Sequence, residues 1–154
     1  QKEKLVLGTY HIHRPSEETF ASCEALDITD YLAVEKFAAK HQTKIKSLLL
    51  INCVGISQNA FAHKANAEEW KQVIDVNLTG TYNVIRAFLP LMREQKEGCI
   101  VNLSSVVAQK GVLGTSAYAA SKAGLDGMIK SIAKENAEKN ITINNIYNRH
   151  SLYG

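Results

Sequence analysis

Short apolar runs alternate with amphipathic stretches along the whole chain, and this alternation constrains the fold more than any other feature. Runs rich in β-branched and apolar residues predict strands, whereas apolar residues spaced three and four apart predict helices. Because strands that alternate with helices form βαβ units, we predict an α/β fold with a mostly parallel sheet. Strands are expected at residues 4–10, 22–27, 47–53, 99–104 and 141–146, and helices at 30–41, 67–95 and 117–139.

Local signals refine this prediction. Asp30 is expected to cap the first helix. The continuous apolar run Ser47–Cys53 is typical of a strand buried on both faces. Trp70 lies on the apolar stripe of the second helix, and Pro90 should bend or divide that helix. Val106–Ser116, with two glycines, is predicted to be a loop.

Composition excludes several classes of protein. The 154 residues are 45% hydrophobic and 21% charged, which fits a single globular domain over residues 1–154. A net charge of +3 without a dense basic run gives no reason to expect a nucleic-acid partner. The longest apolar run, Leu48–Ile51, is too short to cross a membrane, and no signal peptide is visible at the start. Cys23, Cys53 and Cys99 are expected to be buried free thiols in a reducing cytoplasm.

Polar residues follow three of the predicted strands. Asp27, Asn52–Gly55 and Ser104–Ser105 each lie at the end of a strand or just past it. Ligands of open parallel sheets bind beyond the carboxyl ends of the strands. These positions are therefore the first candidates for a functional site.

Tyr118 and Lys122 form the most suggestive pair in the sequence. They lie four residues apart in a predicted helix, so their side chains share one face, with Cβ atoms about 5–6 Å apart. A close cation favours the phenolate form of a tyrosine, which suits proton transfer near neutral pH. Most tyrosine–lysine pairs of this spacing are solvated surface neighbours, so the pair alone does not identify a site.

Further motifs remove that ambiguity. Ser105 followed by Tyr118 and Lys122, after the strand Cys99–Ser104, resembles the signature of the short-chain dehydrogenase/reductase family. The segments Leu26–Asp30, Asn52–Gly55 and Asp75–Gly80 resemble further motifs in the family's order. The resemblance runs from about Leu5 to Ile146. It implies a Rossmann-like doubly wound parallel sheet and an NAD(P)-dependent oxidoreductase, closest to 3-oxoacyl-acyl-carrier-protein reductases.

The same resemblance implies roles for individual residues. Tyr118 would be the general acid in carbonyl reduction and the base in alcohol oxidation, and Lys122 would assist it and bind the nicotinamide ribose. Ser105 would orient the carbonyl, and Asn77 would support a water linked to Lys122. The coenzyme would also contact Asp27, Ile28, Asn52, Val54 and Gly55.

The expected ligands and partners follow. Residues Tyr10–Arg14 offer no acidic side chain, and Arg14 suits a 2′-phosphate, so NADP is favoured over NAD. His11 and His13 alternate but lack a third ligand, so no metal site is expected. The resemblance implies a carbonyl or alcohol substrate, including acyl-carrier-protein-linked ones. It also implies a homodimer or homotetramer built on helices 67–95 and 117–139, consistent with apolar residues on several faces of the first: Val76, Val84 and Leu91.

Departures from the family pattern leave a second hypothesis open. The sequence contains no T-G-x-x-x-G-x-G turn, and the family's first strand, which would lie between residues 4–10 and 47–53, is missing. We therefore expect an incomplete sequence with a gap in the sheet. Residues 147–154 replace the family's Pro-Gly turn and lid, and Cys53 and Val54 replace Asn and Ala. A non-catalytic binding or scaffold protein that retains the family core is the alternative.

Overall fold

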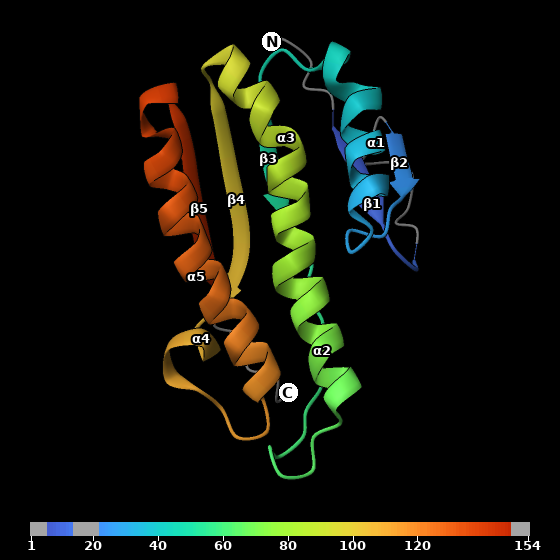
Figure 1. Cartoon of the computed structure of the whole chain (residues 1–154), viewed down its shortest axis with the longest axis vertical. Coiled ribbons are helices and arrows are strands. Elements are labelled where there is room, and N and C mark those ends of the chain that lie inside the picture. The colour runs from blue at the N-terminus through green and yellow to red at the C-terminus, as the bar shows by residue number, and fades with distance from the viewer. Residues whose placement is uncertain (1–5, 14–21, 149–154) are drawn as a thin grey trace.

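The computed structural model describes residues 6–13 and 22–148 (Figure 1). Strands and helices alternate in it as predicted. The strands are β1 (Leu7–Tyr10), β2 (Ser22–Ala25), β3 (Leu49–Asn52), β4 (Gly98–Ser105) and β5 (Ile141–Asn148). The α-helices are α1 (Tyr31–His41), α2 (Ala67–Ile74), α3 (Thr81–Gln95), α4 (Val107–Lys110) and α5 (Ser116–Asn136). Short 3-10 turns follow α1 (Gln42–Lys44) and α5 (Ala137–Lys139), and a π-helical turn, Asp75–Gly80, separates α2 from α3.

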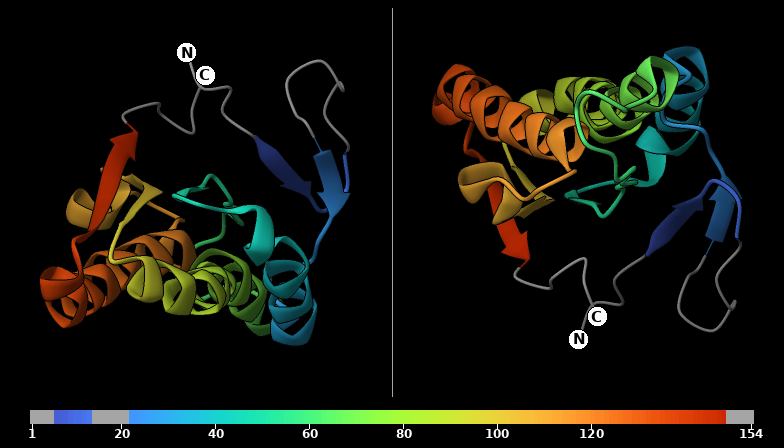
Figure 2. Two further views of the ribbon diagram at one scale, coloured as in Figure 1. Left: turned by 90° about the horizontal axis from the view of Figure 1, so that it is seen from above. Right: turned by 90° about the horizontal axis from the view of Figure 1, so that it is seen from below.

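All strand pairs are parallel, which confirms the predicted α/β class. They form two sheets, β1-β2 and β3-β4-β5. Within the described residues no ladder joins β1 to β3, and the two sheets diverge when seen end on (Figure 2). The expected gap between these strands is therefore present.

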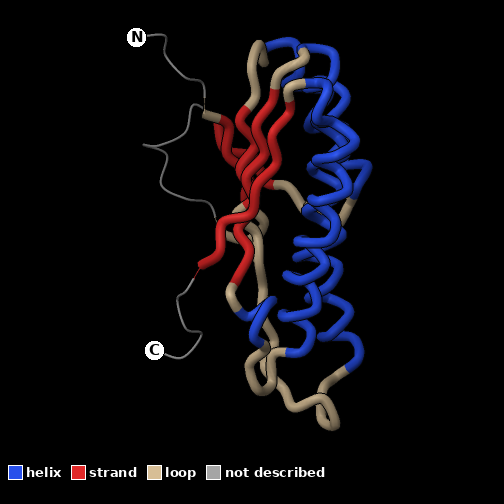
Figure 3. Tube along the Cα trace, turned by 90° about the vertical axis from the view of Figure 1, so that its left-hand side faces the viewer, coloured by secondary structure: helices blue, strands red, loops and turns tan. Residues whose placement is uncertain are grey.

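The main helices cover one side of the strands (Figure 3). The first core cluster lies where α3 and α5 pack on β4 and β5, and comprises Ile85, Met92, Ile100, Ile132, Ile141 and Ile143. The second lies between α1 and α3, and comprises Ile28, Val34, Ala38, Val84 and Phe88. Val84 is therefore occupied within its own chain, and it is not available for the partner contact expected from the sequence.

The prediction that the strand Ser47–Cys53 is buried on both faces is wrong, because one face of β3 is exposed. Leu49 and Ile51 are 57% and 54% exposed, because no described helix covers them. Trp70, expected on a core stripe, is 41% exposed. The three cysteines are free as predicted, but Cys53 is exposed and the other two are only partly buried.

The long helical pattern divides at a different place from the one predicted. Pro90 lies inside α3, which continues to Gln95. Pro90 is on the exposed face of the helix, so the carbonyl of Arg86 that loses its bond faces the solvent side. The interruption falls instead at Asp75–Gly80, where the backbone widens into a π-turn. Such turns occur frequently at functional sites.

Capping residues define the starts of α1 and α2. The Asp30 side chain accepts a hydrogen bond from the Ala33 amide, as predicted. Asn66 caps α2 by accepting from Glu68 N.

The predicted loop after β4 contains the short helix α4. Arg14 and the residues after Asn148 lie outside the described residues. No helix in the described part of the chain is long and apolar enough to span a membrane.

Candidate active site

Lys122 is a buried cation at the carboxyl end of the sheet. Its side chain lies in α5, and the residue is 2% exposed. Nζ donates to the carbonyl of Leu103 in β4 at 2.7 Å and to that of Val54, after β3, at 3.4 Å. Burial lowers the pKa of Lys122 below its ordinary value. The structure therefore holds an ammonium group between the ends of two neighbouring strands.

Tyr118 lies one helical turn before Lys122, on the same face of α5. Its ring centroid is 5.7 Å from Nζ, and the residue is half-buried. The pair is thus not a solvated surface pair, because the lysine is directed into the protein. The helix starts at Ser116, directly after the loop that leaves β4, so its first turns return to the strand ends.

Asn77 ties the π-turn to this site. It is fully buried, and its Nδ2 donates to Ile56 O at 2.9 Å and to Ser121 Oγ at 3.0 Å. Its Oδ1 accepts from the Ile56 amide at 2.8 Å. Ser121 Oγ donates in turn to the Tyr118 carbonyl at 2.8 Å. Asn77 therefore connects the loop after β3 with the turn of α5 that carries Tyr118.

Gly55 lies close to Lys122 and Asn77, where there is little room for a side chain. A Cβ atom at this position would lie 3.3 Å from Lys122 Nζ and 3.9 Å from Asn77 Oδ1. The missing side chain lets the loop after β3 approach both residues. The structure thus brings Val54, Gly55, Asn77 and Lys122 together as neighbours.

Ser105 ends β4 at the same edge of the sheet. It is 5% exposed, and its Oγ accepts from the Val107 amide at 3.2 Å. It lies two residues after Leu103, whose carbonyl binds Lys122. The hydroxyl of Ser105 and the ammonium of Lys122 are therefore fixed by adjacent parts of one strand.

The remaining candidate coenzyme residues differ in accessibility. The exposed Asp27 carboxylate accepts from Thr29 Oγ1 at 2.7 Å and from Thr29 N at 2.8 Å, and these bonds lower its pKa. The side chain of Ile28 is buried in the second core cluster, so its contact with a coenzyme would have to involve the main chain. Asn52 donates to Asn102 Oδ1 at 2.8 Å, and its side chain thus links β3 to β4.

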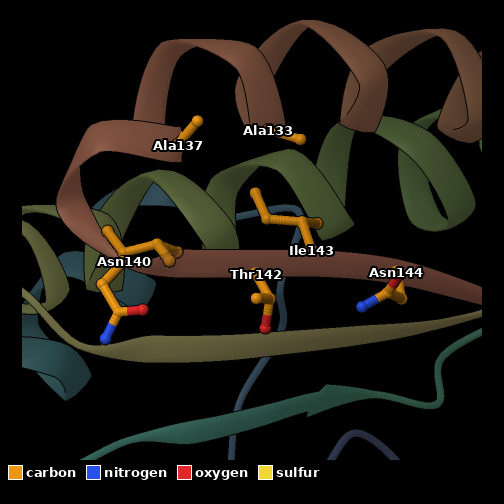
Figure 4. Close-up of a pocket in the computed structure, with 7 residues that line it drawn as sticks. Ala133, Ala137, Asn140, Thr142, Ile143 and Asn144 are labelled. Carbon is orange, nitrogen blue, oxygen red and sulfur yellow. The ribbon is translucent and has the colours of Figure 1, made fainter.

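Two other features lie apart from this site. His11 Nε2 is 3.8 Å from Asp27 Oδ2, and no three potential ligands in the described ranges gather around a metal position. A hollow beside the end of α5 is lined by Ala133, Ala137 and the first residues of β5 (Figure 4). It lies at the start of β5, away from the carboxyl ends of the strands.

Sequence reasoning missed Ser121, Asn102 and Asp126. Ser121 directly precedes Lys122, and its hydrogen bond to Asn77 needed the position of the π-turn. Asn102 pairs in register with Asn52 and Asn145, and Asp126 accepts from Asn145. Strand register would have revealed this alignment, but the sequence alone does not give it.

Several curated proteins are similar to this chain in sequence. The chain is 38% identical over 130 residues to the acetoacetyl-CoA reductase of Shinella zoogloeoides, covering 84% of this chain and 54% of that protein. It is 42% identical over 120 residues to the 3-oxoacyl-acyl-carrier-protein reductase FabG of Thermotoga maritima, covering 77% of this chain and 49% of the relative. A FabG of Chlamydia muridarum is 40% identical over 111 residues, 72% of this chain and 44% of its own length.

The chain spans about half the length of these curated relatives. The match to the family described as short chain dehydrogenase extends over residues 4–148 and so includes every candidate site residue. On this match, and on identities near 40% to its reductases, the chain belongs to the short chain dehydrogenase family.

Proposed function

We propose that the protein is an NAD(P)H-dependent oxidoreductase that reduces a carbonyl group, or oxidises the corresponding alcohol. The observation that carries the proposal is the buried Lys122 ammonium, 5.7 Å from the Tyr118 ring at the carboxyl edge of a parallel sheet. Burying a lysine costs free energy unless the charge has partners.

The residues around Lys122 fit the nicotinamide end of a coenzyme. An ammonium group has three donors, and its contacts with Leu103 and Val54 use two of them. The third would bind a ribose hydroxyl. Gly55 would line the coenzyme beside Lys122, and Asp27 would line it farther along the edge. The bound nicotinamide supplies the hydride. We favour NADPH because the described end of β1, Tyr10–His13, has no acid for an adenosine ribose.

The roles of the protein groups follow from their chemistry. The Tyr118 hydroxyl would donate a proton to the carbonyl oxygen in reduction and accept one in oxidation. The positive charge of Lys122 would offset the negative charge that the reacting oxygens carry during the proton transfer. Ser105 would hydrogen-bond the same oxygen, and Asn77 would hold the loop and helix that frame the site.

The substrate is proposed to be a 3-oxoacyl compound, carried by coenzyme A or an acyl carrier protein. The names of the relatives support this class. Val112 and Leu113, in the loop before α5, are 40% and 78% exposed and offer apolar surface beside the start of that helix. We further propose a cytoplasmic homodimer or homotetramer built on α2, α3 and α5, where Trp70 and Tyr82 are exposed.

Two observations favour the alternative of a binding or scaffold protein. The two sheets are not joined between β1 and β3 within the described residues, and the printed sequence has no Gly-rich turn for a pyrophosphate. Coenzyme binding separates the two hypotheses. A scaffold would show no saturable binding of NADPH or NADH.

The proposal is tested with the complete gene product and acetoacetyl-CoA, by following NADPH and NADH absorbance. Tyr118→Phe should lower kcat by about 100-fold or more, because it removes the proton donor while keeping the ring. Tyr31→Phe is the matched control, since Tyr31 is 46% exposed on α1 and its ring lies under Arg86. Turnover by Tyr118→Phe equal to that of the control would refute the role of Tyr118.

A further inference from the structure

A chain of side-chain amides crosses the three-stranded sheet next to the site. Asn52 in β3, Asn102 in β4 and Asn145 in β5 are aligned by the strand register. Asn52 Nδ2 donates to Asn102 Oδ1 at 2.8 Å, and Asn102 Nδ2 donates to Asn145 Oδ1 at 3.1 Å. Asn145 Nδ2 donates to Asp126 Oδ1 in α5 at 2.6 Å. We call these four residues the Asn–Asp ladder.

Asp126 sets the direction of the whole ladder. An ionised carboxylate only accepts hydrogen bonds, so Asn145 must turn its NH2 group toward Asp126 and its oxygen toward Asn102. Asn102 must then turn its NH2 group toward Asn145 and its oxygen toward Asn52. Asp126 Oδ1 also accepts from Ser104 Oγ at 3.3 Å. One carboxylate therefore ties α5 to β4 and β5 and orders amides as far as β3.

The ladder lies directly beside the groups that hold Lys122. Val54 follows Asn52 by two residues, and Leu103 follows Asn102 by one. The carbonyls of Val54 and Leu103 are the two acceptors of the Lys122 ammonium. The Asn52–Asn102 bond thus adds a side-chain contact to the backbone ladder of β3 and β4, next to the residues that present these carbonyls. Ser104, bonded to Asp126, stands between Leu103 and Ser105.

We propose that Asp126 is a positioning residue that acts through the Asn–Asp ladder and Ser104, fixing the carbonyl pair that binds Lys122 and the strand end that carries Ser105. This inference rests on the proposed function for its kinetic consequence, but its structural consequence does not depend on catalysis. Tyr147, in register with Ser104, is a further hydrogen-bond partner of Asp126. Burial and then hydrogen bonding with Asp126 raise the pKa of Tyr147, so its hydroxyl stays protonated.

Two variants of Asp126 separate positioning from general stability. Asp126→Leu removes the acceptor but keeps the branching and the number of heavy atoms of the side chain, and it leaves Asn145 and Ser104 without their partner. Asp126→Asn keeps an oxygen acceptor and is the conservative rescue. Both are made in the complete gene product, where the titration of Lys122 is followed by the NMR signal of its 13Cε, assigned with Lys122→Arg.

The expected results differ for the two variants. In Asp126→Leu the carbonyl pair separates and water reaches Lys122, so its pKa rises toward the ordinary value of lysine. The same variant should lose about tenfold or more in kcat, as expected for the loss of hydrogen bonds to a charged acceptor. In Asp126→Asn both the Lys122 titration and kcat should stay within about twofold of the wild type.

Several outcomes would overturn the inference. The inference is wrong if Asp126→Leu folds and Lys122 titrates in it as in the wild type. It is also wrong if Asp126→Asn changes the Lys122 titration and kcat as much as Asp126→Leu does. If Asp126→Leu does not fold, Asn145→Leu breaks the next link and is judged by the same titration. If the wild-type protein lacks reductase activity, the proposed function fails, and the titration alone still decides the role of Asp126.

Discussion

Gly80 provides a sharp test of how the π-turn packs. This glycine ends the turn that carries Asn77, and it lies against Ile28, one residue past Asp27. A Cβ atom at Gly80 would be 2.6 Å from Ile28 Cγ1 and 2.8 Å from Ile28 Cδ1. Ile28 cannot easily move, because it belongs to the core cluster with Val34 and Phe88. Gly80→Ala should therefore force that cluster apart.

The magnitude follows from a comparison with Gly127, in the middle of α5. A Cβ atom at Gly127 would meet nothing within 4 Å. Gly127→Ala should stabilise the protein by up to about 1 kcal/mol, because alanine loses less backbone entropy in a helix. Gly80 also has helical dihedral angles, with φ −62° and ψ −43°, so the same gain applies there. At Gly80 the overpacking against Ile28 should reduce this gain in stability by about 1–3 kcal/mol.

Urea unfolding and thermal melting of both variants measure this difference. The two should differ by about 1–3 kcal/mol, or about 2–12 °C in Tm for a chain of this size. In an Ile28→Ala background, Gly80→Ala should lose its cost because both clashing atoms are gone. If Gly80→Ala is as stabilising as Gly127→Ala, the described packing of the π-turn on Ile28 is wrong.

Two further predictions concern stability. Glu24 in β2 accepts from Lys40 Nζ at 2.7 Å and His41 Nε2 at 2.9 Å, and hydrogen bonding with Lys40 is the main cause that lowers its pKa. Glu24→Gln should lower the free energy of unfolding by about 1 kcal/mol or less at pH 7. This loss should vanish as the pH falls through the lowered pKa, because Glu24 of the wild type then becomes protonated. An equal loss in acid and at pH 7 would contradict the prediction. Asn77→Leu should destabilise the protein by about 2 kcal/mol or more in urea, because it leaves both polar groups of Ile56 unpaired; a change below about 0.5 kcal/mol would contradict the described contacts.

Much of the fold was predictable because local signals agreed with it. The order of strands and helices, the Asp30 cap and the gap between β1 and β3 followed from periodicity and from the missing family elements. Exposure of Leu49 and Ile51 did not follow, because a continuous apolar run does not reveal which faces of a strand other elements cover. The π-turn was missed because its residues continue the helical pattern on both sides.

For the candidate site, the sequence predicted residues but not the contacts between them. The motif spacing predicted Ser105, Tyr118 and Lys122 as site residues, and in the structure Lys122 in α5 contacts β4, the strand that ends at Ser105. The hydrogen bonds of Asn77 with Ile56 and Ser121 could not be predicted, because they depend on how the π-turn faces α5. The alignment of three asparagines requires the strand register, which single-sequence patterns leave open.

In the proposed function, a bound nicotinamide coenzyme would supply a hydride to the carbonyl carbon, and Tyr118 would supply the proton. The most direct measurement uses NADPH deuterated at C4, on the transferred face, with the complete gene product and acetoacetyl-CoA. Mass spectrometry of the alcohol should find deuterium on the former carbonyl carbon. The proposal is contradicted if the alcohol contains no deuterium with NADPH labelled on either face of C4. It is also contradicted if no alcohol forms in the presence of the coenzyme.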